Sequence, residues 1–317
     1  MYKDDLIQTH KRIKPYIHNT PVLTSKLIDD IAGANLFFKC ENFQKMGAFK
    51  MRGAANAIME LSDAQRRKGV VTHSSGNFAQ ALSLAAKSLG VKAFIVMPSN
   101  APQVKKEAVK GYGGIILECE STLLAREKAA KDIQEREGAT FLHPSNDMNV
   151  IFGQGTACKE LLEKQPDLDF VVAPVGGGGL IAGTALAAHY FGKNCKVIGG
   201  EPFEVDDAFR SLQSGFIESN TSSNTIADGL KTQLGDKNFP IIQKYVEKII
   251  RVTEQDIVDA MRLIWERLKI VCEASCAVAL AAVLREKGVF QNKKIGIIIS
   301  GGNVDLSNLP FNNEPIK

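Results

Sequence analysis

The chain has 317 residues, of which 44% are hydrophobic, so it can bury the core of one large or two medium domains. A formal net charge of +4 is too small to indicate nucleic acid or an acidic membrane as the main partner. A small molecule is the expected partner.

The N-terminus carries acidic residues and no apolar targeting segment, and no stretch approaches the ~20 apolar residues that span a bilayer. We therefore expect a cytoplasmic protein without a membrane contact. The six cysteines are predicted to be buried free thiols, because only Cys272 and Cys276 are close in sequence and no histidine lies near them to complete a zinc site.

Short apolar runs alternate along the chain with amphipathic segments. The runs predict strands over residues 36–39, 70–72, 93–97, 115–117, 170–173, 197–199, 249–252 and 295–299. The amphipathic segments predict helices over 78–89, 123–137, 155–164 and 253–269. This alternation indicates an α/β fold with mainly parallel strands, arranged as one sheet or two.

Four glycines, Gly176, Gly177, Gly178 and Gly179, follow the predicted strand 170–173 and precede a helical run. Glycines at this position let backbone N–H groups and a helix N-terminus surround an anion. The run lacks the lysine of a nucleotide P-loop and the spacing of a dinucleotide fingerprint, which favours a phosphate on a smaller ligand. A flexible turn between strand and helix is the alternative.

Three further segments carry candidate chemistry. Lys50 lies between apolar neighbours, where desolvation would lower its pKa and make the amine nucleophilic, although a surface lysine shows the same pattern. Residues 72–80 place Ser74 and Ser75 before a helix, either to bind a carboxylate or to cap the helix. Ser300 follows the predicted strand 295–299. Ligands of parallel sheets bind at such strand ends, so the segments can converge on one crevice.

Taken together, these motifs resemble those of the fold-type II pyridoxal-phosphate (PLP) enzymes, the tryptophan synthase β-like fold, and among them the serine racemase and serine/threonine dehydratase family. The resemblance runs nearly end to end, from Arg12-Ile13 and Thr20-Pro21 through Gly76-Asn77, Gly153-Gln154-Gly155-Thr156 and the glycine run to Ser300-Gly301-Gly302-Asn303. It implies two α/β domains with mainly parallel sheets: a large PLP-binding domain, 1–67 and 147–317, and a small mobile domain, 68–146.

The resemblance also implies the roles of the cofactor-binding residues. Lys50 would hold PLP as a Schiff base, Phe49 would pack beside the pyridine ring, and Asn77 would bind the 3′-oxygen. The glycines 176–179 would hold the phosphate, and Ser300 would face the pyridine nitrogen. A hydroxyl group there cannot stabilise a pyridinium, which suits racemisation and β-elimination better than transamination.

Racemisation needs an acid/base group on each face of the substrate, and the resemblance assigns Lys50 and Ser75 to these positions. The substrate carboxylate would be bound by Ser74, by the N–H groups of Gly76, Asn77 and Phe78, and by Arg126. The predicted activity is therefore racemisation of serine with dehydration of serine or threonine.

The resemblance further implies a divalent cation, Mg²⁺ or else Ca²⁺ or Mn²⁺, bound by Glu201, the Val205 carbonyl and Asp207. A solvated helix start is the other interpretation of this acidic segment. Some members of the family bind ATP at a dimer interface, and Gln80, Tyr112 and Lys269 fall near the matching positions. The same family resemblance leads us to expect a homodimer.

Three positions depart from the family's usual residues, and they leave the substrate open. Ala48 replaces a serine, Phe78 replaces a histidine, and Ser145 stands where an asparagine is common. One alternative is a 3-hydroxyaspartate dehydratase or aspartate racemase, whose members share the Gly-Ala-Phe-Lys form of residues 47–50. A second is a non-catalytic ligand-binding protein that has kept the fold.

Overall fold

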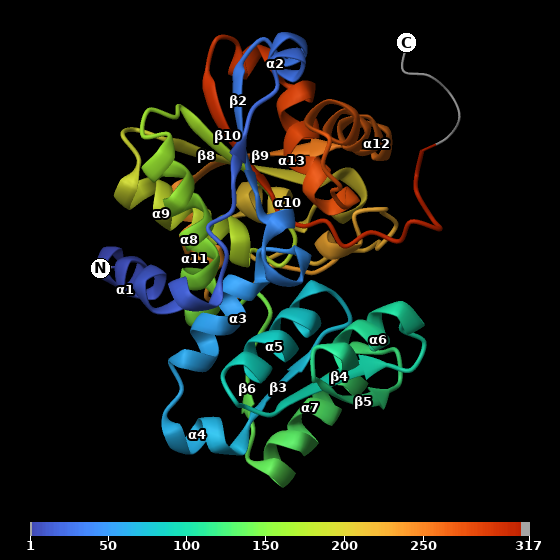
Figure 1. Cartoon of the computed structure of the whole chain (residues 1–317). Helices are drawn as coiled ribbons and strands as arrows, with labels where there is room; N and C mark the ends of the chain where they lie inside the picture. Colours follow the sequence, from blue (N-terminus) through green and yellow to red (C-terminus); the bar gives the residue numbers. More distant parts are fainter. Residues whose placement is uncertain (1, 312–317) are drawn as a thin grey trace.

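Two β-sheets organise the chain, and helices cover both faces of each (Figure 1). The computed structural model describes residues 2–311. The larger sheet consists, in order, of β1 (Val22–Leu23), β2 (Asn35–Cys40), β10 (Lys294–Ile299), β7 (Phe170–Pro174), β8 (Lys196–Pro202) and β9 (Val246–Val252). Strand β1 runs antiparallel to β2, and the other neighbours are parallel.

Alternate residues of the larger sheet face two separate cores. On β10, Ile297 and Ile299 point into one core and Ile298 into the other, as the two-residue period of a strand requires. The first core contains residues of α2 (Lys26–Ala32), α12 (Glu254–Leu263), α13 (Ala274–Arg285) and α14 (Lys287–Phe290). The second contains residues of α1 (Lys3–Ile13), α8 (Met148–Lys164), α9 (Gly179–Phe191), α10 (Asp207–Ser214) and α11 (Phe239–Tyr245).

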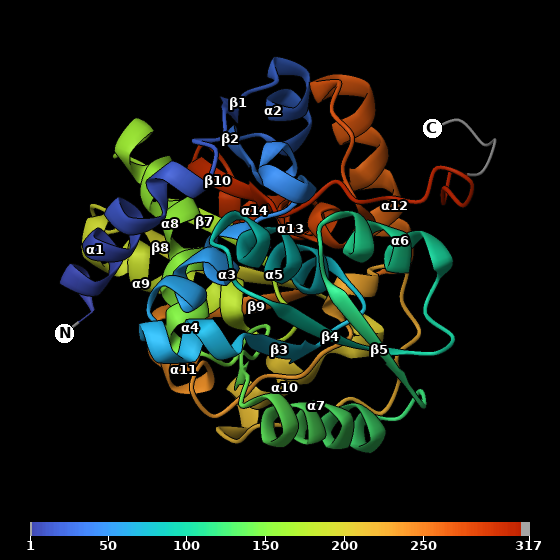
Figure 2. The same cartoon turned by 60° about the horizontal axis from the view of Figure 1, so that its bottom comes forward.

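The smaller sheet comes from one continuous part of the chain. Its parallel strands lie in the order β5 (Ile115–Cys119), β4 (Ala93–Pro98), β3 (Val70–His73) and β6 (Thr140–Phe141). Figure 2 shows α5 (Asn77–Ser88) and α6 (Gln103–Gly111) on one face and α7 (Leu123–Glu137) on the other. Val70 and Val71, successive residues of β3, point to these opposite faces.

Helix α3 (Lys50–Met59), followed by α4 (Asp63–Lys68), links the two sheets. It packs against α8 on the side of the larger sheet and against α5 on the side of the smaller one. Close contact with α8 is possible because Gly53 and Gly153 face each other. A Cβ atom on Gly153 would lie 2.5 Å from the Arg52 carbonyl oxygen.

The α/β class and all eight predicted strands are confirmed. Strands β1 and β6 were not predicted, because two residues are too few to show a period. Helix α8 begins at Met148, seven residues before the predicted start at 155, and Asp147 caps it. Gly153 and Gly155 lie inside this helix, where neighbouring atoms pack closely against them. The predicted helix 253–269 leaves regular α geometry after Leu263 and continues as a π-helix, Ile264–Leu268.

The cysteine prediction is confirmed at four positions and wrong in burial at two. Cys40, Cys158, Cys272 and Cys276 are buried free thiols, whereas Cys119 and Cys195 are free but partly exposed. Within residues 2–311, no helix combines the length and apolar composition that crossing a bilayer requires.

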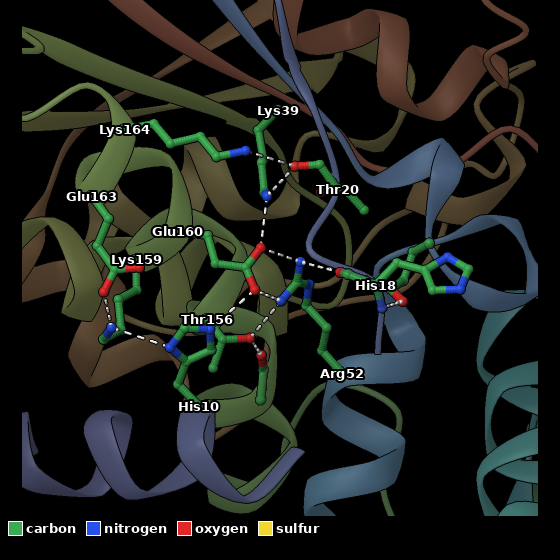
Figure 3. A network of polar contacts seen from close by, with 12 residues as sticks. His10, His18, Thr20, Lys39, Arg52, Thr156, Lys159, Glu160, Glu163 and Lys164 are labelled. Atoms are coloured by element: carbon green, nitrogen blue, oxygen red, sulfur yellow. Dashed lines mark hydrogen bonds and ion pairs between the residues drawn. The ribbon is translucent and has the colours of Figure 1, made fainter. Parts of the chain in front are cut away.

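A buried network of charged groups ties α3 to the larger sheet (Figure 3). The Arg52 guanidinium, which is fully buried, donates to both carboxylate oxygens of Glu41 at 2.7 and 2.8 Å and to both of Glu160 at 2.9 and 2.7 Å. Lys39 on β2 donates to Glu160 at 2.6 Å. Burial alone would raise the pKa of Glu160, but hydrogen bonds from His10 and Arg52 hold it well below its ordinary value.

We predict that Arg52→Ala lowers the free energy of unfolding by about 3–5 kcal/mol, because it leaves two buried carboxylates without their main partner. Urea denaturation of the apoprotein measures the loss. The control is Arg66→Ala, which removes an exposed pair with Asp63 and is expected to cost at most about 1 kcal/mol. If the two variants lost the same free energy of unfolding, the network would not have the importance assigned to it.

Candidate active site

A cavity of about 1040 Å³ lies where strands of both sheets end. Its walls come from the segments that follow the carboxyl ends of β3, β6, β7 and β10. This edge is where parallel α/β sheets bind ligands. The cavity wall includes every predicted cofactor and substrate residue: Phe49, Lys50, Ser74, Ser75, Gly76, Asn77, Phe78, Arg126, Gly176, Gly177, Gly178, Gly179 and Ser300.

Lys50 is the first residue of α3, and backbone hydrogen bonds anchor the segment before it. The Phe49 N–H donates to the Ser300 carbonyl at 2.9 Å, and the Gly302 N–H donates to Gly47 at the same distance. Burial lowers the pKa of Lys50 to about 8, although the negative charge of Glu273 opposes that shift. A substantial fraction of the amine is therefore neutral and nucleophilic near neutral pH.

The ammonium group of Lys50 has few polar neighbours. It donates to the Pro144 carbonyl at 2.8 Å and lies 5.0 Å from the ring centre of Phe49 and 5.7 Å from that of Phe78. Phe78 is itself buried. The Lys50 amine thus lies in apolar surroundings, as the apolar residues beside it in the sequence predicted.

The four glycines form a loop between β7 and α9 in which side chains have no room. A Cβ atom would lie 2.7 Å from Leu230 Cα at Gly176 and 2.9 Å from Ser145 Cα at Gly179. At Gly178, φ is +79°, and a Cβ would lie 2.6 Å from Asn238 Oδ1. The Asn238 amide also donates to the Gly177 carbonyl at 2.9 Å. The loop is therefore closely packed against its neighbours, which favours a shaped loop over the alternative of a flexible turn.

The serines at the end of β3 do not cap α5. The N-cap residue is Gly76, and no side chain caps the helix. Ser74 Oγ instead accepts the Gly76 N–H at 3.3 Å, and both Ser74 and Ser75 are half-buried in the cavity wall. This geometry leaves the hydroxyl group of Ser75 available to a ligand in the cavity.

Sequence analysis missed several titratable groups of the cavity, and two of them, Glu273 and His143, have strongly shifted pKa values. Glu273 is buried at the start of α13, and burial raises its pKa to about 7. His143 accepts the N–H groups of Ser145 and Asn146 on Nδ1, at 3.2 and 2.8 Å. Burial lowers the pKa of His143 to about 4, so it is neutral with its proton on Nε2. The only sequence signal for Glu273 is an acidic residue inside an apolar run.

The predicted metal ligands lie outside the cavity wall. Glu201 ends a buried stretch of β8, Val205 lies in the short helix η4 (Phe203–Val205), and Asp207 begins α10. Glu201 and Asp207 are fully buried. Glu201 accepts the N–H groups of Ala208 and Phe209, and Asp207 accepts those of Leu234 and the Asn220 side chain.

The comparisons with known proteins agree with this geometry. Residues 13–301 match the family described as pyridoxal-phosphate dependent enzyme. The chain belongs to this family. It is 51% identical to a serine racemase of Dictyostelium discoideum over 96% of this chain and 95% of that one, and 48% identical to a β-hydroxyaspartate dehydratase of Paracoccus denitrificans over 98% of each. The maize serine racemase structure superposes with a TM-score of 0.94, at 48% identity, over 96% of this chain and 94% of that one.

The cavity fits the cofactor that gives the family its name. PLP carries an aldehyde, which needs a nucleophilic amine, and a phosphate, which needs backbone N–H groups in close approach. Lys50 meets the first requirement through its lowered pKa. The glycine loop meets the second, because it lines the cavity with bare backbone and leads into the N-terminus of α9.

We predict that Gly178→Ala weakens PLP binding by roughly tenfold. A left-handed alanine costs about 1–2 kcal/mol and would clash with Asn238, so the free loop moves to relieve the strain and must return to bind the phosphate. Absorbance titration of the apoprotein with PLP measures the affinity. Gly288→Ala is the matched control: this glycine lies in α14, far from the cavity wall, and its Cβ would meet no atom within 4 Å. Equal affinity of the two variants would contradict the prediction.

Proposed function

We propose that the chain is a PLP-dependent serine racemase that also dehydrates serine and threonine. The observation that carries this proposal is Lys50, an amine with a lowered pKa, in one cavity with Ser75 and the glycine loop. The serine racemases at about half identity support the same activity.

Each part of the cavity has a separate task in this proposal. The glycines 176–179 hold the phosphate, Ser300 faces the ring nitrogen, and Asn77 binds the 3′-oxygen, with Phe49 beside the ring. PLP, when bound, supplies an electron sink for the bonds at the substrate's Cα. Lys50 then moves the Cα proton on one face, and Ser75 moves it on the other.

The substrate carboxylate binds at the start of α5. Ser74 and the N–H groups of Gly76, Asn77 and Phe78 are the donors, and Arg126 adds positive charge. Residues 68–146, which contain the smaller sheet and α5, act as a mobile domain that closes over the substrate and excludes water. Closure of this kind brings Ser75 and the carboxylate-binding groups toward Lys50.

A second candidate activity is dehydration of 3-hydroxyaspartate, with aspartate racemisation as its counterpart. The observation that favours it is Arg126, which shares the cavity wall with two histidines, His73 and His143. A guanidinium can bind the second carboxylate of a dicarboxylic substrate. The relative from Paracoccus denitrificans, a β-hydroxyaspartate dehydratase, supports this alternative.

The activity is tested by incubating the holoenzyme with L-serine and measuring D-serine by chiral chromatography and pyruvate by a coupled assay. We expect both products from the wild type and neither from Lys50→Ala, which also loses the absorbance of lysine-bound PLP. Ser75→Ala should keep that absorbance and lose D-serine, since one face of Cα lacks its acid/base group.

Parallel assays with L-threonine, threo-3-hydroxyaspartate and aspartate separate the two candidate activities. Turnover of 3-hydroxyaspartate without turnover of serine or threonine would replace the first proposal by the second. A wild-type protein that binds no PLP through Lys50 would reject both and leave the non-catalytic alternative.

We also propose a divalent cation, Mg²⁺ or else Ca²⁺ or Mn²⁺, at Glu201, the Val205 carbonyl and Asp207. Two fully buried carboxylates lie in one short segment, and oxygen ligands of this kind suit such cations. The ion supports the fold and takes no part in the chemistry.

Treatment with a chelator should lower the melting temperature of the holoenzyme by several degrees, and Mg²⁺ should restore it, because a bound ion stabilises the folded state. The control is Glu201→Gln, which should melt at one temperature with or without Mg²⁺. A wild type that is insensitive to both treatments would exclude this site.

ATP binding and a homodimer stay predictions. Gln80 is buried in the cavity wall, whereas Tyr112, at the end of α6, and Lys269, on the surface, lie outside it. A nucleotide that contacts all three would therefore extend beyond the cavity.

A further inference from the structure

We propose that Glu273 is a positioning residue that fixes the side-chain amide of Asn77, so that Asn77 offers an N–H donor to the cavity. This inference rests on the proposed function, in which Asn77 binds the cofactor's 3′-oxygen. A chain of four hydrogen-bonded residues, Met46, Asn303, Asn77 and Glu273, carries it.

The chain starts at a backbone carbonyl, which can only accept hydrogen bonds. Met46 has a φ of +56°, rare for a residue with a side chain, and Gly47 follows with a φ of +77°. A Cβ atom on Gly47 would lie 2.6 Å from Asn303 Oδ1. The Asn303 side chain donates through Nδ2 to the Met46 carbonyl at 2.9 Å. The orientation of the Asn303 amide is therefore set by the backbone.

The same Asn303 nitrogen donates to Asn77 Oδ1 at 2.9 Å. The oxygen of the Asn77 amide is thus occupied, and its NH₂ group must point the other way. There it meets the Glu273 carboxylate, with Nδ2 at 3.0 and 3.1 Å from the two oxygens. A reversed amide would place its NH₂ group against the NH₂ group of Asn303 and its oxygen against the oxygens of the buried Glu273, so both contacts would be lost.

These contacts leave one polar group of Asn77 for a ligand. An asparagine amide has one oxygen and two N–H groups. The oxygen faces Asn303, and one N–H is shared between the two carboxylate oxygens of Glu273. The remaining N–H is a donor, so the ligand atom it meets must be an acceptor, as a deprotonated 3′-oxygen is.

Glu273 contacts two asparagines of this chain, because it also accepts the backbone N–H of Asn303. It is the N-cap residue of α13, yet its side chain makes no capping hydrogen bond. Its carboxylate lies against the backbone of Gly301, where a Cβ atom would be 2.8 and 3.0 Å from the two oxygens. The side chain is only 7% exposed. A carboxylate turned from its helix into the cavity wall is better explained by its contact with Asn77.

The proposal is tested by a double-mutant cycle on PLP affinity, with Glu273→Gln, Asn77→Ala and the double variant titrated as apoproteins. Glu273→Gln keeps the size but replaces one of the two acceptor oxygens by an NH₂ donor, so the side chain at 273 can pair with either orientation of the Asn77 amide. We expect Glu273→Gln to weaken PLP binding by roughly tenfold and to add little to Asn77→Ala. The visible absorbance band of the Glu273→Gln holoenzyme should also shift, since the band reports on the 3′-oxygen.

Glu286→Gln is the matched control, because Glu286 ends the same helix α13 and pairs with Lys248 on the surface. It should leave both the affinity and the band unchanged. Should Glu273→Gln fail to fold, Asn303→Ala removes the other contact that orients Asn77, from an exposed position, and the same non-additivity with Asn77→Ala is expected.

Losses that multiply in the double variant, or an unchanged affinity and band in Glu273→Gln, would overturn the role of Glu273. A wild type that fails to bind PLP through Lys50 would overturn the proposed function instead, so the two failures are distinguishable.

Discussion

The buried guanidinium of Arg52 is the interaction on which the site depends most. It joins three elements that are distant in sequence: Glu41 after β2, Glu160 on α8, and its own helix α3. Lys50 begins that helix two residues earlier. Because Arg52 is held by four charge-assisted hydrogen bonds, the start of α3 cannot turn or slide independently of the larger sheet. A network outside the cavity therefore fixes the position of the lysine inside it.

Close backbone approach is the second constraint, and glycine provides it in two places. Gly53 and Gly153 let α3 lie against α8, which brings Arg52 to Glu160. The glycines 176–179 let the end of β7 approach Ser145 and Leu230. The packing that holds α3 and the packing that shapes the phosphate loop both exclude any side chain. Close backbone contacts at these glycines therefore hold the elements in place, in addition to the buried charges.

The sequence predicted the strands and the α/β class because these depend on local patterns, whereas the predicted residues of the cavity wall came from such patterns together with the family resemblance. An apolar run flanked by turns marks a parallel strand, and polar residues after it mark the ligand edge. Glu273 and His143 could not be found in this way. Their roles come from contacts with residues far away in sequence, such as Asn77 on α5, and a single acidic residue in an apolar run gives no pattern. Domain boundaries, residue roles and the metal site stay predictions.

The placement of charge around the cavity bears on the class of reaction. Under the proposed assignment, the uncharged hydroxyl of Ser300 faces the ring nitrogen, while the buried carboxylate of Glu273 contacts Asn77 instead. A carboxylate beside the nitrogen would stabilise its protonated form and strengthen the electron sink, whereas a hydroxyl does not. With a weaker sink, negative charge at the substrate's Cα is short-lived. This charge is removed in one of two ways. Immediate return of a proton to Cα is the step of racemisation, and loss of the β-hydroxyl group is the step of dehydration.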